Sequence, residues 1–350
     1  MNFSELECSL IRIVNASLML QRETNFNRTL NMDKPNQYML REWIMYPSYS
    51  GMKLFLMPTV VCFLAALVST PLVLLAIYSN FSIRLETRFL LMGNTLVCDI
   101  LYLLFYTTIT ICNTLNLKTP KHICVLFLFV LAVTYFGGVL TAAAMVVDTY
   151  VAVLWPLHYV SLLPATRTKT FIMFLWFCSF LFSGIAFLTL NFTQKPLPCP
   201  LEVCSLPVIL LVALHGDDVL KLCYILFIGI FLLCLSLILC CYIYLCYKTR
   251  ETGIWKSVSS RASVTFLMHF TLLFLYFSPL ILLLTDALLY MSQFIGLRTG
   301  LWVTLTICNV LIVLPKAVSP CLYGLRYRQI YNSLKLFLKL KKHRGIAPVR

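Results

Sequence analysis

The stretch ICVLFLFVLAVTYFGGVLTAAAMVVDTYVAV, residues Ile123–Val153, decides the fold of this chain. It carries a single charged side chain, Asp148, close to its end. About 20 mostly apolar residues are enough for a helix to cross the ~30 Å hydrocarbon layer of a bilayer. An open sheet or irregular chain cannot do so, because lipid offers its backbone amides no hydrogen-bond partner. The stretch therefore predicts a membrane-spanning helix.

Further apolar runs of comparable length accompany it, separated by short polar connections. They lie near Leu54–Tyr78, Phe89–Leu115, Phe171–Leu190, Leu220–Tyr247, Val264–Tyr290 and Leu301–Leu325. The chain is 60% hydrophobic and 12% charged with a mean hydropathy of +0.88, whereas soluble domains are about 25% charged. The predicted fold class is all-α, an integral membrane bundle of seven helices. The tails and connections leave no room for a soluble enzyme domain.

Basic residues predict the orientation of the bundle. Of the 28 lysines and arginines, 16 fall in connections and a tail that are cytosolic if the N-terminus is outside. Such an excess on the cytosolic side orients helices during insertion. We therefore expect an extracellular tail over residues 1–52, a transmembrane domain over 53–325 and a cytoplasmic segment over 326–350. The net charge of +15 is explained in this way, and no nucleic-acid partner is expected.

The N-terminal tail carries three sequons for N-glycosylation, at Asn2, Asn15 and Asn27, and a fourth at Asn191 follows the fourth run. All four lie on the predicted extracellular side, whereas Asn80 falls in a cytosolic turn and should stay unmodified. No apolar signal segment follows Met1, so the first span is expected to act as its own insertion signal.

Most of the 15 cysteines lie inside the apolar runs, where cysteine usually serves as a small buried hydrophobe. Cys124, Cys199 and Cys204 differ, because they face the predicted exterior, where an oxidising environment permits a disulfide. Cys204 is favoured as the partner of Cys124, and Cys199 remains the alternative.

Several landmarks at compatible spacing resemble the rhodopsin-like, class A G-protein-coupled receptors, from Leu54 to about Leu340. They are LLMGNTLVCD ending at Asp99, Asp148-Thr149-Tyr150 after Cys124, Trp176, Phe277-Ser278-Pro279, and Ser319-Pro320-Cys321-Leu322-Tyr323. The resemblance implies a plasma-membrane receptor with an unknown extracellular ligand and a heterotrimeric G protein as its partner. A narrower resemblance, to one orphan receptor of vertebrates, rests on Gly253-Ile254-Trp255, Ser260-Arg261-Ala262 and Leu325-Arg326-Tyr327-Arg328-Gln329.

Thr149 is a departure from the family pattern, which has an arginine between the aspartate and the tyrosine. Threonine can neither form an ion pair with Asp148 nor present a planar cationic group to a G protein. Coupling would then use other cytosolic groups, be weak, or be absent. A neutral substitution in an ordinary receptor is the remaining interpretation.

Lys316 is a second departure, because a lysine inside a membrane helix is costly and usually marks a paired or functional site. It lies four residues before Pro320, too deep for the retinal lysine of opsins. The resemblance places it beside Asp99, where family members hold a sodium ion, with Thr70, Gly138 and Ser319 standing for residues that help hold it. Our hypothesis is a buried Asp99–Lys316 pair that replaces sodium. The alternative is that Lys316 extends to a water-filled cavity.

The expected ligand pocket is mostly apolar and aromatic. Leu131 stands where amine receptors carry an aspartate, so a biogenic amine is not expected. Tyr135, Phe277 and Asp286 complete the candidate lining, although such a set is equally typical of helix packing. Asp286, with Glu202, Asp217 and Asp218, forms an acidic rim that favours a cationic or peptide ligand, or is simply a solvated group of charges.

After Tyr323 the chain resembles an amphipathic eighth helix, with apolar residues at helical spacing among lysines and arginines. This pattern predicts a helix on the anionic inner leaflet. The apolar positions are Ile330, Leu334, Phe337 and Leu338. The five histidines are scattered without ligand spacing, so neither a metal, a cofactor nor an enzymatic activity is expected.

Other functions stay open beside an orphan receptor. The segment from Tyr150 to Tyr159 also resembles odorant receptors, so a chemosensory receptor of the same fold is an alternative. Thr149 keeps open a receptor-like partner with impaired signalling. A transporter or channel is disfavoured, because no internal repeat is present and membrane acids are few.

Overall fold

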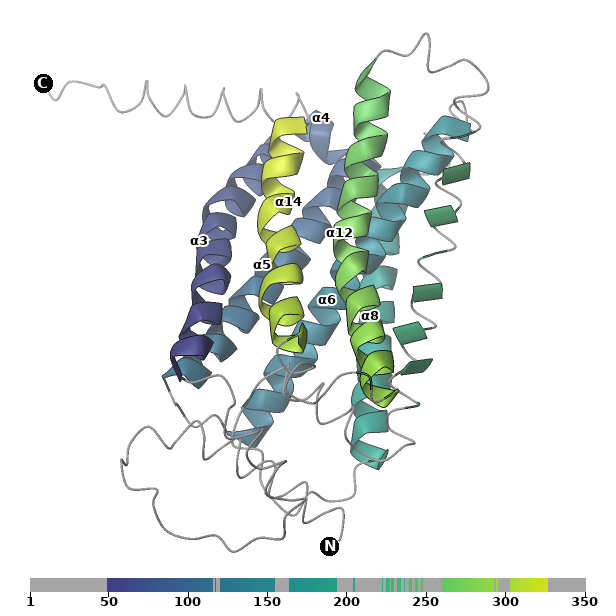
Figure 1. Ribbon diagram of the computed structural model, residues 1–350. Coiled ribbons are helices and arrows are strands. Elements are labelled where there is room, and N and C mark those ends of the chain that lie inside the picture. Colours follow the sequence, from purple (N-terminus) through teal and green to yellow (C-terminus); the bar gives the residue numbers. More distant parts are fainter. Residues whose placement is uncertain are drawn as a thin grey trace, which may run out of the picture.

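The computed structural model describes residues 49–115, 117, 120–154, 164–193, 260–292, 294 and 303–326, with isolated positions between 204 and 247. Within these residues the chain is helical and contains no strand (Figure 1). The elements are α3 (Tyr49–Ser79), α4 (Phe81–Arg84), α5 (Thr87–Thr114), α6 (Lys121–Leu154), α8 (Ala165–Thr193), α12 (Ser260–Met291), η2 (Ile307–Leu311) and α14 (Val313–Arg326).

Five helices of the described part are long and apolar enough to cross a membrane, and α12 contributes a shorter apolar segment, Thr271–Asp286. They correspond to six of the seven predicted spans. The predicted fifth span, Leu220–Tyr247, is described at isolated positions only. An all-helical membrane bundle is therefore confirmed. The predicted eighth helix lies outside the described residues.

Some of the helices extend beyond the apolar runs that predicted them. The fourth span was expected over Phe171–Leu190, but α8 begins at Ala165 and ends at Thr193. Hydropathy misses such ends, because polar residues in the membrane interface continue the helix without adding to the apolar run. One consequence is that Asn191 lies in the last turn of α8 rather than in the connection that follows it.

Short connections arrange the first helices side by side. Asn80 separates α3 from α4, and the amide of Arg84 donates to the carbonyl of Asn80 at 3.1 Å. After Leu85 and Glu86, α5 begins; it runs back along α3 and also packs against α6. Because it contacts neighbours on several sides, α5 buries polar residues such as Asn94 and Asp99 as well as apolar ones.

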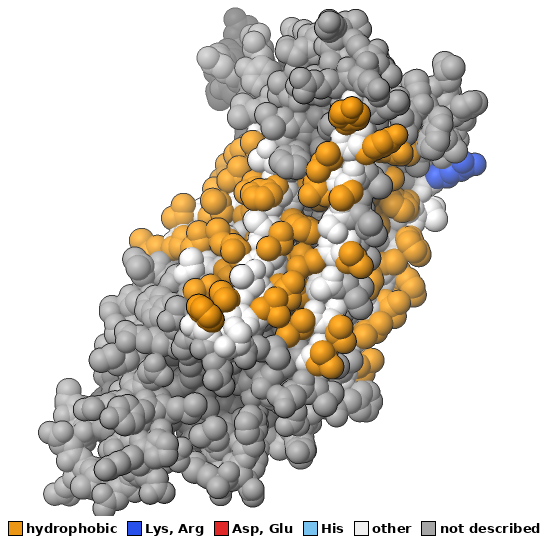
Figure 2. Space-filling view, turned by 45° about the vertical axis from the view of Figure 1, so that its right-hand side comes forward, with side chains coloured by type: hydrophobic (Ala, Val, Ile, Leu, Met, Phe, Trp, Pro, Cys, Tyr) orange, Lys and Arg blue, Asp and Glu red, His pale blue; other side chains and the backbone are white. Residues whose placement is uncertain are grey.

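Burial differs strongly between helices. In α8, 17% of the most apolar window is buried, whereas the corresponding value for residues 303–324 is 61%. Phe174, Phe177 and Leu181 are exposed along one face of α8. Figure 2 shows hydrophobic side chains spread over the described part of one face of the molecule. Exposed apolar area on this scale is typical of contact with lipid rather than water.

The core consists of two clusters of buried side chains. One contains Val139, Leu272 and Tyr323. The other contains Tyr106, Leu283 and Cys204, and lies at the end of the bundle that carries the disulfide described below. Tyr135 packs against both clusters, so it lies between the two halves of the core.

The last described span is not a uniform α-helix. Its residues Ile307–Leu311 form the π-helical turn η2, in which the amide of Ile312 donates to the carbonyl of Ile307 at 3.0 Å. Single π-turns of this kind occur frequently at functional sites. The turn lies directly before α14, the helix that carries Lys316.

Candidate functional site

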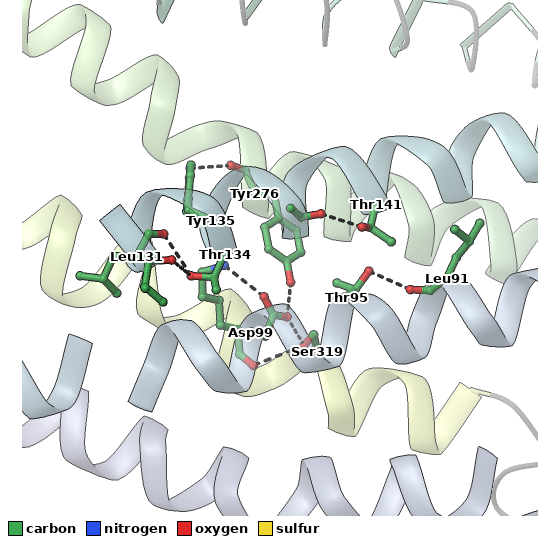
Figure 3. Close-up of polar contacts among 12 residues, drawn as sticks. Leu91, Thr95, Asp99, Leu131, Thr134, Tyr135, Thr141, Tyr276 and Ser319 are labelled. Atoms are coloured by element: carbon green, nitrogen blue, oxygen red, sulfur yellow. Dashed lines mark hydrogen bonds and ion pairs between the residues drawn. The ribbon is translucent and has the colours of Figure 1, made fainter. Parts of the chain in front are cut away.

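Asp99 is the centre of the candidate site. It lies midway along α5, is 0% exposed, and accepts from three side chains. The hydroxyl of Ser319 donates to Oδ2 at 2.9 Å, the hydroxyl of Tyr276 donates to the same oxygen, and the ammonium of Lys316 donates to Oδ1 at 3.1 Å. Tyr276 and Ser319 point toward Asp99 from two further helices (Figure 3). The carboxylate thus connects α5, α12 and α14.

Lys316 is 1% exposed and forms an ion pair with Asp99. Three tyrosine rings surround its ammonium: Nζ lies 4.7 Å from the ring centroid of Tyr102 and 5.1 Å from those of Tyr135 and Tyr276. Ring faces attract a desolvated cation, so the cage offsets part of the cost of burying this charge. The structure therefore brings the two charges together and does not direct Lys316 to the surface.

Gly138 of α6 closes one side of the pair. A Cβ atom at this position would lie 3.5 Å from Oδ1 of Asp99 and 3.7 Å from Nζ of Lys316, which leaves room for little more than a methyl group. Thr70 of α3 is buried, but its hydroxyl has no hydrogen-bond partner. Of the three residues that the family resemblance singled out around a sodium ion, Ser319 forms a hydrogen bond to Asp99, Gly138 lies beside the pair, and Thr70 forms no contact to it that the structure shows.

Two prolines lie close to the donors of this network. Pro279 follows Tyr276 by three residues in α12, and Pro320 follows Ser319 directly in α14. Proline removes a backbone hydrogen bond and bends a helix. Each of the two helices that donate to Asp99 therefore lacks a backbone hydrogen bond close to its donor.

A second polar network joins α5 to α6 and α8, closer to the core cluster that contains Val139, Leu272 and Tyr323. The indole of Trp176 donates to Oδ1 of Asn94, and the amide of Asn94 donates to the hydroxyl of Thr141, each at 2.9 Å. These two hydrogen bonds link α8 to α5 and, through Asn94, to α6.

The Asp148-Thr149-Tyr150 segment lies in the last turns of α6. Asp148 is buried, and the hydroxyl of Thr149 donates to the carbonyl of Met145 at 2.8 Å. Threonine thus folds back onto its own helix. Tyr323 of α14 is fully buried nearby, with its hydroxyl 3.9 Å from Sδ of Met145.

The opposite end of the bundle, here called the disulfide end, carries the bridge between Cys124 and Cys204, whose Cα atoms are 5.5 Å apart. The bridge joins the start of α6 to the segment that contains Cys204, and the amide of Asn113 in α5 also donates to the carbonyl of Cys204. Cys199, the alternative partner, lies outside the described residues. A cross-link here restricts the end of the bundle where α5, α6 and this segment meet.

The candidate ligand residues fall into two groups. Leu131 is buried in the cluster at the disulfide end, and Tyr135 and Phe277 pack in the core. Asp286 instead forms a hydrogen bond to a residue that the sequence did not suggest: the hydroxyl of Thr304 donates to its Oδ2 at 2.8 Å. Thr304 lies near the start of the last span, and no sequence pattern there pointed to Asp286.

Several positions predicted from the sequence lie outside the described residues. Three of the four glycosylation sequons, at Asn2, Asn15 and Asn27, and the apolar positions of the tail belong there. Among the described residues, no group of three or more histidine, cysteine, aspartate or glutamate side chains is placed to hold a metal ion.

Sequence reasoning missed the tyrosine cage and the π-turn. Tyr102 follows Asp99 by three residues on one helix, which places both on one face, so its proximity to the pair was foreseeable. The ring of Tyr276 and its hydroxyl contact with Asp99 were not, because they depend on how α12 is rotated against α5.

Comparison with known proteins agrees with this arrangement. The model of the family described as 7 transmembrane receptor (rhodopsin family) matches residues 43–323. The chain is also 27% identical over 289 residues to Probable G-protein coupled receptor 148 from Homo sapiens, which covers 81% of this chain and 82% of that protein. The narrower resemblance seen in the sequence agrees with this relative. The helical bundle, the buried charge network and the family match lead to one conclusion: the chain belongs to the rhodopsin family of seven-transmembrane receptors and is a receptor rather than an enzyme.

Proposed function

We propose that the chain is an orphan receptor of the plasma membrane that binds an extracellular ligand at its disulfide end and signals through a heterotrimeric G protein. The single observation that carries the proposal is the network around Asp99. It joins α5, α12 and α14 at the centre of the bundle through one ion pair and two hydrogen bonds to a carboxylate, and α12 and α14 each carry a proline close to the donor. An internal contact of this kind provides a discrete arrangement that a ligand at one end can bias.

The proposed orientation places the N-terminus and the disulfide end outside and the Asp148 end of α6 inside. The excess of basic residues on the inner side supports it, as does the oxidising environment that a disulfide requires. We also propose glycosylation of the four sequons and contact of the basic tail with anionic lipid.

A biogenic amine is not the proposed ligand. Leu131 is buried among apolar residues at the position where a carboxylate would hold an amine. No charged side chain of the described part of α6 lies near this level of the helix.

Signalling tests the function directly. The measurement is the basal output of the surface-expressed chain across a panel of G-protein reporters, for the wild type and for Thr149→Arg at equal surface level. Output from the wild type supports coupling through the existing Thr149. Silence in the wild type with output from Thr149→Arg would instead support the receptor-like partner with impaired signalling, since Thr149 is the residue that folds back onto α6.

We further propose that the ammonium of Lys316 takes the place of a sodium ion beside Asp99. Thermal stability of the purified chain should then be equal in sodium chloride and in choline chloride at the same ionic strength. A clear stabilisation by sodium would contradict this role of Lys316.

A further inference from the structure

Asp286 is a buried carboxylate with an incomplete set of partners. It lies two turns beyond Pro279 in α12 and is 5% exposed. One oxygen, Oδ2, accepts from the hydroxyl of Thr304 at 2.8 Å. The other oxygen, Oδ1, is buried and has no hydrogen-bond partner. Buried polar atoms in proteins are nearly always hydrogen-bonded, so an exception of this kind needs a physical reason.

No cation buried in the described part serves this carboxylate. Lys316 is the basic residue among the buried side chains, and its ammonium already donates to Asp99. A carboxylate removed from water without a counter-charge is costly. Among the described residues, Oδ1 therefore remains available to accept a hydrogen bond from a donor that another molecule supplies.

The surroundings of Asp286 show what kind of group that molecule would bring. One turn inward on the same helix, Leu283 is buried in the cluster that contains Tyr102, Leu131 and Cys204. This cluster ends at the disulfide, so Asp286 lies at the proposed extracellular end. Sites for small organic ligands are typically apolar and aromatic with a few polar groups, and a carboxylate as the polar group favours a ligand with a cationic group.

We infer that Asp286, positioned by Thr304, binds a guanidinium or amidinium group of the extracellular ligand. This inference rests on the proposed receptor function and deepens it. A guanidinium is less strongly hydrated than an ammonium and offers several donors in one plane, so it is the cation that an apolar site desolvates most easily. Its contact with a carboxylate is a charge-assisted hydrogen bond, the stronger kind.

The test uses two probes of the same shape, benzamidinium and the neutral benzamide. Each is added to the purified full-length chain, and the melting midpoint is measured as the probe concentration rises. Benzamidinium should raise the midpoint of the wild type in a saturable way, by a few degrees once its concentration is about ten times its dissociation constant. Benzamide should raise it much less.

Asp286→Asn is the decisive variant, because the asparagine keeps an acceptor for Thr304 and loses only the charge. It should abolish the preference for benzamidinium. Glu86→Gln is the matched control: it also removes one carboxylate, next to Arg88 at the other end of the bundle, and should keep the preference. Equal shifts for the two probes in the wild type, or no shift with either, would overturn the inference even if Asp286→Asn failed to fold.

These outcomes are independent of signalling. If the chain prefers benzamidinium but gives no output in any G-protein reporter, the cation site is supported and the proposed coupling is contradicted. If the chain signals but does not distinguish the two probes, the receptor function is supported and the cation site at Asp286 is contradicted.

Discussion

Asp99 and Asp286 are both buried in this bundle, but the two carboxylates differ in the number and kind of donors that they receive. Asp99 receives an ammonium and two hydroxyls from α12 and α14, and three tyrosine rings surround the ammonium. Asp286 receives one hydroxyl. A carboxylate whose partners all come from its own chain holds helices together. One with a partial set is suited to a partner from outside.

The largest difference should appear when the counter-charge of Asp99 is removed. Lys316→Met leaves the carboxylate uncompensated in the core, and breaking such a pair typically lowers the free energy of unfolding by about 3–5 kcal/mol. Surface expression and the melting midpoint in detergent measure the loss.

The double variant Lys316→Met/Asp99→Leu is the control for Lys316, because it removes both charges at once. It should recover most of the stability, since a buried ion pair is often replaceable by apolar residues. If the single variant is as stable as the wild type, the pair does not hold the centre of the bundle together.

The disulfide end should be the next most sensitive region. Cys124→Ser removes a bridge between residues 80 apart in sequence, and the loss of such a disulfide usually costs about 2–5 kcal/mol. The melting midpoint should fall, as it should after treatment of the wild type with a reductant. Cys178→Ser, at a free and half-buried cysteine, should change it little; equal losses in both variants would contradict a specific role of the bridge.

The next prediction concerns how much a single hydroxyl group contributes to the stability of the Asp99 network. Tyr276→Phe keeps the ring over Lys316 and removes a donor to the carboxylate. A hydrogen bond to a charged group contributes about 1.5–3 kcal/mol, and the free energy of unfolding should fall by that amount. Tyr135→Phe is the matched control, because its hydroxyl makes only a long contact, 3.4 Å, to the carbonyl of Tyr276.

The smallest effect on stability should come from Asp286→Asn. Oδ1 has no partner to lose, and the asparagine still accepts from Thr304, so the change in the free energy of unfolding should stay within about 1 kcal/mol. Chemical denaturation of the ligand-free chain beside Lys316→Met measures the contrast. A loss as large as that of Lys316→Met would mean that Asp286 is a structural residue like Asp99.

Sequence alone predicted the membrane helices, because the hydrophobicity of a run is the sum of contributions from its residues and does not depend on contacts with other helices. It also suggested that Lys316 and Asp99 form a pair, because the family resemblance places Lys316 beside Asp99 and a lysine inside a membrane helix usually has a partner. The position of Tyr276 relative to them could not be predicted, because contacts between helices depend on their rotation. Thr304 was missed for a similar reason: nothing near it in sequence points to Asp286.

The π-turn η2 also determines which way two distant side chains face. Thr304 and Lys316 are twelve positions apart, and in an uninterrupted α-helix they would differ in direction by about 120° around the axis. A π-turn takes up roughly one extra residue, which reduces the angular difference to about 20°. The turn thus sets the phase of the last helix, so that one stripe along it reaches both carboxylates. Lengthening the helix by a single residue there would rotate one of the two side chains by about 100°, away from its carboxylate.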